Sequence, residues 1–112
     1  MITALMKGVP YLLQSAVTSG NGAVVMVPIT CNKLDFFVVG AGTISGGALS
    51  IEEAYDPDYT GTWSVIQAIT LTSITAGAIV VVHVEGTFRA VRARVSTPVT
   101  GGGTVTVYAM SN

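Results

Sequence analysis

Charged residues are scarce in this chain, at 10% of 112 residues against roughly 25% in average soluble domains. Hydrophobic residues make up 50% of the sequence. The five basic and six acidic residues nearly balance. So few basic side chains exclude a phosphate-tracking groove, and no nucleic-acid partner is expected. A surface this poor in charge favours association with other protein chains.

Cysteine and histidine are almost absent, with Cys31 and His83 as single representatives. A lone cysteine forms no internal disulfide, which favours folding in a reducing cytosol. Two such ligands are too few for a structural zinc site, and no cofactor is expected. His83 lies in a run of valines, and the nucleophile-elbow motif is missing. We therefore assign no catalytic residue and expect that the chain is not an enzyme.

Sustained helical periodicity is also missing. Clusters of Gly, Asn, Asp and Pro separate short segments rich in Val, Ile, Thr and aromatic residues, a pattern typical of strands joined by turns. This pattern predicts an all-β fold, a seven- to eight-stranded antiparallel β-sandwich of the jelly-roll type. Residues 1–9 are expected to form an N-terminal arm and residues 10–112 a single domain. The expected strands are residues 11–17, 23–29, 34–39, 48–55, 63–71, 79–85, 88–97 and 104–110.

The longest uncharged stretch, residues 60–82, has enough nominal hydropathy to suggest a membrane span. Gly61, Gln67, Ser73 and Gly77 interrupt it, and threonine recurs along it. This composition predicts two strands and a turn, so no membrane partner is expected. The N-terminal apolar runs are short and interrupted, and a signal peptide is not expected.

Two expected strands, residues 23–29 and 34–39, are apolar on both faces. Each sheet of a small sandwich has only one inner face, so the second apolar face must meet solvent or another chain. In one interpretation, loops or the N-terminal arm cover these second faces. We favour the other, in which the faces form an interface between subunits. The candidate interface residues are Val25, Val27, Phe37 and Val39, or their opposite-face neighbours.

Arg89, Arg92 and Arg94 cluster near one expected strand, and alternation places Arg92 and Arg94 together on one face. Arginine suits bidentate pairs with carboxylates. We expect these three arginines to pair with Glu52, Glu53 or Asp58, either across the sheet or across a subunit interface, which makes Arg92 and Arg94 further candidate interface residues.

Residues 52–58 also hold most of the acidic residues of the chain. Calcium would find oxygen ligands there, but the D-x-D-x-D-G spacing is missing, which favours a solvated turn. Tyr55, Tyr59 and Trp63 flank this loop, and aromatic rings beside acids suit stacking on sugars. In the opposing interpretation, Trp63 anchors the core between the sheets. Whether residues 52–58 bind an ion or a glycan stays open.

Four stretches follow a recognisable pattern. Residues 11–27, YLLQSAVTSGNGAVVMV, match "LL-x-x-A-T-x-x-G-x-G", and residues 49–71, LSIEEAYDPDYTGTWSVIQAITL, match a strand–loop–strand with a tryptophan after the loop. Residues 85–97, EGTFRAVRARVST, are similar to "G-P-[WF]-R-x-[VI]-R-x-x-V-T", and residues 100–110, TGGGTVTVYAM, are similar to a closing "G-G-[TS]-V-T-V" strand. In these stretches the chain resembles small β-sandwich virion proteins of tailed bacteriophages. It departs from them at residues 55–58, where the family often has Ser-x-Asp-Gly.

The resemblance implies a structural virion protein of the capsid decoration, or cement, type. Such a subunit would self-associate, most often as a homotrimer, and bind the major capsid protein on the capsid surface after assembly in the host cytoplasm. The alternative is a carbohydrate-binding module of a tail, baseplate or fibre, which would contact host glycans through Trp63, Tyr55 and Tyr59. Both locations, head and tail, agree with the sequence.

Overall fold

The structure, a computed structural model, describes residues 3–28, 31–74 and 77–111. Within these ranges the regular structure is almost entirely β, with a single turn of 3-10 helix, η1 (Leu71–Ser73). No helix in the described ranges has the length and apolar character needed to cross a membrane. The strands are β1 (Thr3–Ala4), β2 (Tyr11–Val17), β3 (Gly20–Asn21), β4 (Val25–Met26), β5 (Lys33–Ala41), β6 (Gly46–Ala54), β7 (Ser64–Thr70), β8 (Ile79–Glu85), β9 (Ala90–Thr100) and β10 (Thr104–Ser111).

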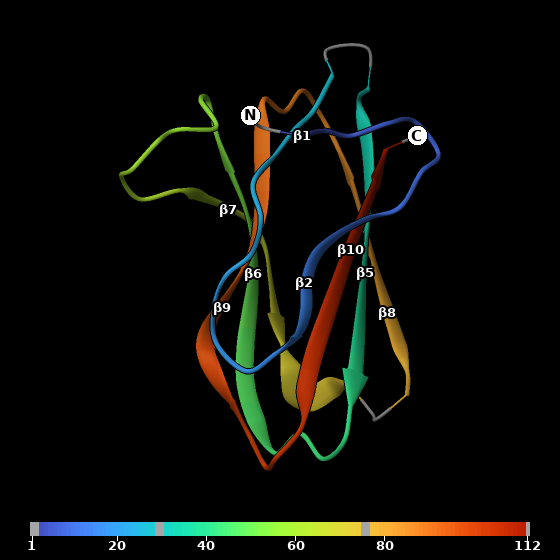
Figure 1. Cartoon of the computed structure of the whole chain (residues 1–112), viewed down its shortest axis with the longest axis vertical. Coiled ribbons are helices and arrows are strands. Elements are labelled where there is room, and N and C mark those ends of the chain that lie inside the picture. The colour runs from blue at the N-terminus through green and yellow to red at the C-terminus, as the bar shows by residue number, and fades with distance from the viewer. Residues whose placement is uncertain (1–2, 29–30, 75–76, 112) are drawn as a thin grey trace.

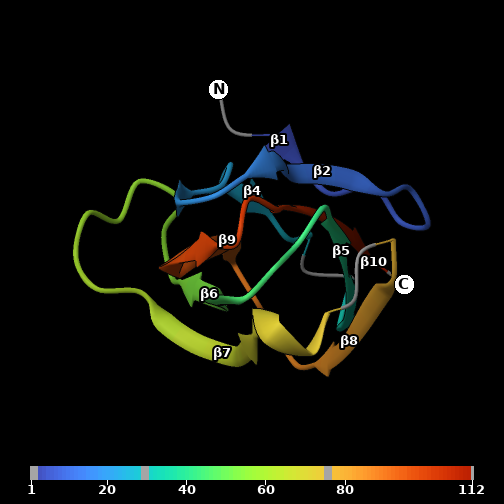
Figure 2. The ribbon, with the colours of Figure 1, turned by 90° about the horizontal axis from the view of Figure 1, so that it is seen from below.

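The strands form two sheets that pack face to face (Figures 1 and 2). The first sheet has the order β1-β4-β9-β6-β7, and β3 also pairs with β9. The second sheet has the order β2-β10-β5-β8. All pairs are antiparallel except β1 with β4. The predicted all-β sandwich is therefore confirmed, and seven of the described strands are seven residues or longer.

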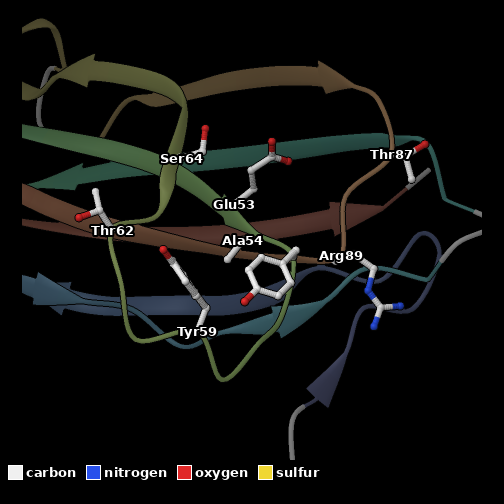
Figure 3. Close-up of a pocket in the computed structure, with 8 residues that line it drawn as sticks. Glu53, Ala54, Tyr59, Thr62, Ser64, Thr87 and Arg89 are labelled. Carbon is white, nitrogen blue, oxygen red and sulfur yellow. The ribbon is translucent and has the colours of Figure 1, made fainter.

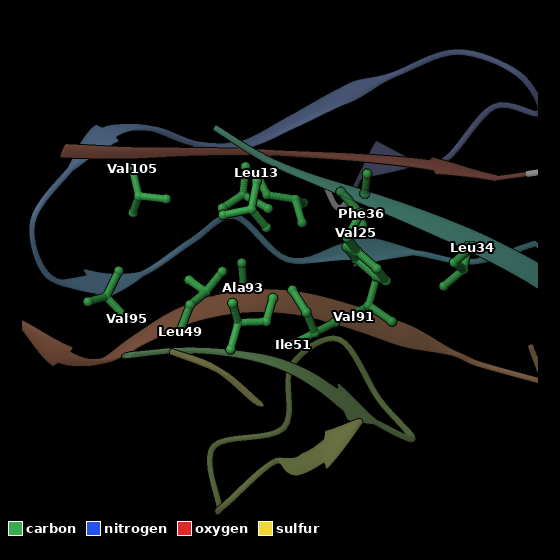
Figure 4. Packing of buried hydrophobic residues seen from close by; sticks show 14 of the residues in the cluster. Leu13, Val25, Leu34, Phe36, Leu49, Ile51, Val91, Ala93, Val95 and Val105 are labelled. Carbon is green, nitrogen blue, oxygen red and sulfur yellow. The ribbon is translucent and has the colours of Figure 1, made fainter. Parts of the chain in front are cut away.

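The core lies between the two sheets (Figure 4), and alternate residues point into it along much of β5, β9 and β10. On β9, Val91 and Ala93 point inward, as the alternation predicted. On β5, Phe36 is wholly buried, and its neighbour Phe37 is half-buried on the outer face. Other core residues with no exposed surface are Val25, Leu34, Val38, Leu49, Ile51, Leu71, Val105, Val107 and Ala109.

The expected strand over residues 23–29 is much shorter in the structure. Only Val25–Met26 forms a strand, and Ile29 lies outside the described residues. The backbone here divides its hydrogen bonds between the sheets, since Ala23 N donates to Leu13 O of β2 and Val27 N donates to Arg89 O. A segment that passes from one sheet to the other does not extend a single ladder, and Pro28 has no N–H to contribute.

The N-terminal segment, expected to be an arm, packs on the sandwich in its described part. Thr3–Ala4 pairs with β4, and Leu5 N donates to Met26 O at 2.9 Å. The Leu5 side chain belongs to the core. Gly8 N donates to Ser111 O at 2.7 Å, which joins the segment to the end of β10.

Candidate functional site

The loop between β6 and β7 projects from the body of the sandwich and contains the aromatic residues singled out in the sequence (Figures 1 and 2). Its tip is a turn in which Asp58 N donates to Asp56 Oδ1 at 2.8 Å and Tyr59 N donates to Asp56 O at 3.1 Å. Proline favours the second position of such a turn, and aspartate favours the first. Asp56, Pro57 and Asp58 therefore form the predicted turn, which returns the chain toward the first sheet.

Trp63, at the end of this loop, is only 4% exposed. Its indole Nε1 donates to Tyr59 O at 3.1 Å, and the Arg92 guanidinium carbon lies 4.4 Å from the ring centroid. The ring is therefore closed to a sugar, which removes Trp63 from the predicted glycan contacts. It also lies outside the core between the sheets. Instead, Trp63 fastens the loop to the outer face of the first sheet.

Glu52 on β6 lies beside Trp63 and is only 2% exposed. Its two carboxylate oxygens accept hydrogen bonds from Arg92 Nε at 3.0 Å and Arg94 Nε at 2.9 Å. Ser50 Oγ donates to the same carboxylate at 3.0 Å. The register explains the cluster, because Glu52 pairs with Arg92, and Ser50 with Arg94, across β6 and β9. The expected arginine–acid pairing occurs here within one sheet.

The electrostatics of this carboxyl group follow from its surroundings. Burial raises the pKa of Glu52, but the hydrogen bonds from Arg94, Arg92 and Ser50 favour the charged form more strongly. The net result is a pKa below the ordinary value of 4.5. Glu52 therefore stays ionised near neutral pH, as the partner of two guanidinium groups.

The structure separates the predicted interface residues into two groups. Val25 and Val27 are 0% and 3% exposed within the core, so they do not contribute to the surface. The reason is that the short β4 lies between β1 and β9 and buries these two side chains toward the second sheet. Phe37 and Val39 are half-buried and lie on the outer side of β5, opposite the inward Phe36 and Val38. Only these two stay candidates for contact with another chain.

Phe37 and Val39 belong to a larger outer apolar face on the second sheet. Cross-strand pairing places Phe37 between Tyr108 of β10 and Val81 of β8, and places Val39 beside Ile79. Tyr108 in turn pairs with Leu12 of β2. A shallow hollow of about 320 Å³ on this face has walls that include Phe37, Val39, Ile79 and Tyr108. We define the outer apolar face as Leu12, Phe37, Val39, Ile79, Val81 and Tyr108.

A second hollow, of about 370 Å³, lies where the loop between β6 and β7 meets the end of the first sheet (Figure 3). Two tyrosine rings, Tyr55 and Tyr59, form part of its wall, with centroids 5.4 Å apart and planes inclined at 52°. Tyr55 is 74% exposed. We call this site the tyrosine hollow; its remaining wall residues are Glu53, Ala54, Thr62, Ser64, Thr87 and Arg89.

The sequence analysis found the tyrosines of this hollow but not its polar groups. Glu53 and Arg89 come together because Ala54 of β6 pairs with Ala90 of β9, which places their chain neighbours at the same end of the sheet. The register joins two strands that are far apart in the sequence, so it cannot be predicted from the local sequence around either residue. Among the described residues, no three His, Cys, Asp or Glu side chains gather closely enough to hold a metal ion.

Comparison with known proteins gives matches to solved structures only. No protein-family model matches the sequence, and no curated protein matches it. The SPBc2 prophage-derived protein YomS superposes with a TM-score of 0.55 at 16% identity, over 92% of this chain and 90% of that one. The PBSX exported protein XepA gives 0.54 at 15% identity, over 94% of this chain but only 37% of XepA. The chain therefore shares its β-sandwich fold with prophage-derived proteins.

Proposed function

We propose that this chain is a structural subunit of a phage particle that packs against copies of itself and against other virion proteins. The outer apolar face of the second sheet is the observation that carries the proposal. The prophage origin of the structural neighbours and the sequence resemblance to virion proteins support the phage assignment.

The outer apolar face has the character of a protein contact. Ile79 is 60% exposed, and Leu12, Val81 and Tyr108 each expose more than a third of their surface. Monomeric soluble proteins rarely expose contiguous apolar patches of more than a few hundred Å². Four paired strands of this length present roughly 400 Å² on one side, and the outer apolar face occupies the part away from Lys33, Asp35, His83 and Glu85. Covering this face with a second protein removes apolar area from water, which favours association.

The size of the face also bears on the kind of assembly. A stable pairwise interface needs about 800 Å² from each partner, so the outer apolar face supplies less than half of one. A contact of that size is weak alone and gains strength when many copies bind neighbouring positions on a lattice. This is the situation of a decoration protein, so the finer proposal is a capsid decoration (cement) subunit. It would form a homotrimer and bind the major capsid protein at the capsid surface.

A second candidate function, a carbohydrate-binding module of a tail or baseplate, is favoured by one observation, the tyrosine hollow. It depends on Tyr55 and Tyr59, since Trp63 is closed to ligands. The two functions use different surfaces of the sandwich and are compatible in one virion protein.

Sedimentation equilibrium over a concentration range from micromolar to millimolar tests the first proposal, since a contact of this size is weak in solution. We expect an oligomer for the wild type and a monomer for Ile79→Lys and Val81→Lys, because each lysine places a charge in the contact. Val65→Lys is the matched control, since Val65 is equally exposed, at 52%, but lies on β7 of the first sheet. Circular dichroism verifies that each variant is folded.

Co-sedimentation with empty capsids of the encoding phage tests the finer proposal. We expect wild-type and Val65→Lys protein to pellet with the capsids, and Val81→Lys to stay in the supernatant. A wild-type protein that is monomeric and also fails to pellet with capsids would contradict the capsid role.

A further inference from the structure

We infer that the tyrosine hollow is a binding site for a neutral hexose unit of a polysaccharide. The inference deepens the second candidate function and rests on it, but it does not depend on self-association. It is carried by the combination of two aromatic rings with unpaired polar side chains in one solvent-open hollow (Figure 3).

The two tyrosine rings of the site are unusually exposed for large aromatic side chains. Tyr55 leaves three quarters of its surface in water, and Tyr59 leaves over a third, although both rings are large enough to pack in the core. Their inclined arrangement forms a corner rather than a flat stack. The apolar C–H face of a pyranose ring can pack on either ring, since aromatic side chains combine a large apolar area with specific geometry.

The polar side chains of the site have unused hydrogen-bonding groups. Glu53 is half-buried, Arg89 is exposed, and both line the hollow, on opposite sides of the Ala54–Ala90 pair. Within the described residues, neither side chain has a hydrogen-bond or ion-pair partner. A carboxylate accepts two hydroxyl donors, and a guanidinium donates up to five hydrogen bonds. Thr62, Ser64 and Thr87 add hydroxyl groups to the same wall. These groups match the ring of hydroxyls around a hexose.

The charges around the hollow select a neutral ligand. Asp56 and Asp58 stand in the same loop as Tyr55 and Tyr59, so the carboxylates outnumber the single guanidinium of Arg89 and repel a phosphate. Arg89 in the wall disfavours a cation such as choline, although two tyrosines would otherwise suit one. A wholly apolar ligand would leave Glu53 and Arg89 desolvated without partners. A neutral, hydroxyl-rich ligand avoids all three penalties.

Part of the site is held in place before any ligand arrives. Tyr59 follows the hydrogen-bonded turn at Asp56, and its carbonyl accepts the Trp63 indole N–H. Its ring lies against Gly61, where an added Cβ would overlap the Tyr59 hydroxyl group. A hollow of about 370 Å³ falls within the range of small-ligand sites. Because Trp63 bonds directly to the loop of Tyr59, the single tryptophan reports on ligand binding.

The test is a titration followed by Trp63 fluorescence and by saturation-transfer NMR. The probes are the methyl glycosides of glucose, galactose, mannose and N-acetylglucosamine, with choline and inorganic phosphate as competitors of other chemistry. We expect saturable binding of at least one glycoside, with a Kd on the order of 1 mM. Tyr55→Ala should weaken binding about tenfold or more, and Glu53→Gln should also weaken it.

The matched control is Tyr108→Ala, since Tyr108 is an exposed tyrosine of the other sheet and should leave sugar binding unchanged. Tyr55→Phe keeps the ring and should retain affinity within about threefold. Binding of none of the four glycosides, or binding that Tyr55→Ala does not alter, would overturn the inference, as would preference for choline or phosphate. Sedimentation measures self-association separately, so failure of the sugar site and failure of the structural role are distinguishable.

Discussion

The Glu52 cluster gives the sharpest prediction for stability. In Glu52→Gln the side chain keeps its shape and one acceptor oxygen, but the negative charge between Arg92 and Arg94 is lost. An amide NH₂ then faces a guanidinium donor in place of a carboxylate oxygen. The variant therefore leaves two positive charges and at least one donor beside a group that is almost wholly buried.

The expected loss follows from the exposure of each partner. Arg92 is 16% exposed, so its charge-assisted bond contributes about 1.5–2 kcal/mol. Arg94 is 37% exposed, so solvent screening reduces its contribution to about 0.5–1 kcal/mol. The two contributions together predict a destabilisation of about 2–3 kcal/mol, a sizeable part of the 5–15 kcal/mol typical of a domain. The melting temperature should fall by roughly 10 °C.

Urea unfolding at one fixed protein concentration measures this loss, with far-UV circular dichroism as a probe independent of Trp63. We expect a midpoint about 1.5 M lower for Glu52→Gln, with an unchanged m-value. Glu53→Gln is the control, because its half-buried carboxylate has no partner in the described residues, and we expect a change within about 0.5 kcal/mol. A loss below about 0.5 kcal/mol for Glu52→Gln would refute the electrostatic interpretation.

The dependence on pH provides an independent check of the same cluster. The folded pKa of Glu52 lies below its ordinary value of 4.5. Its stabilising contribution is therefore fully present above pH 4.5 and is lost as the pH falls through the folded pKa. The wild type should lose its advantage over Glu52→Gln in that acidic range. An advantage that persists at low pH would show that shape, rather than charge, separates the two proteins.

Three further predictions concern packing. Phe36→Ala should destabilise the fold by about 3–5 kcal/mol and Phe37→Ala by less than about 1 kcal/mol, because only Phe36 is wholly buried. Urea unfolding measures both losses, and similar values would contradict the assigned inner and outer faces of β5. Gly103→Ala should lower the free energy of unfolding by about 2 kcal/mol or more, since its Cβ would stand 2.5 and 2.6 Å from two backbone carbonyl oxygens. An unchanged urea midpoint would contradict that crowding. Cys31, 4% exposed, should react with a thiol reagent slowly in the native protein and quickly in urea; fast native labelling would contradict its burial.

The fold was accessible from the sequence because alternation and turn chemistry are local. On β9, the alternation of Val91 and Ala93 with Arg92 and Arg94 predicted which residues point inward. On β5 both faces are apolar, so alternation does not distinguish Phe36 from its neighbour. Pairing with β8 and β10, which lie far along the chain, determines which face meets the core.

The candidate sites were accessible only in part, because they depend on register. Val25 and Val27 have the composition of an interface and lie in the core, since the segment passes between the two sheets. Trp63 stands beside tyrosines in sequence, but the cross-strand position of Arg92 closes its ring. In both cases the residue type was informative, and the deciding contact came from a distant strand.

The few charged residues of the chain are distributed unevenly over the sandwich, and their positions bear on the proposed contact surface. Of the eleven charged residues, Glu52, Arg92 and Arg94 pair with one another on the outer side of the first sheet, beneath the loop that Trp63 fastens. On the outer side of the second sheet, Lys33, Asp35, His83 and Glu85 gather toward one end, and the outer apolar face occupies the other. The outer side of the first sheet is covered in part by its own loop, and the proposed contact with other chains lies on the outer side of the second sheet. Packing through the second sheet keeps the tyrosine hollow, at the end of the first, open to solvent. Val81→Lys should accordingly abolish self-association without altering hexose affinity, and Tyr55→Ala should do the reverse.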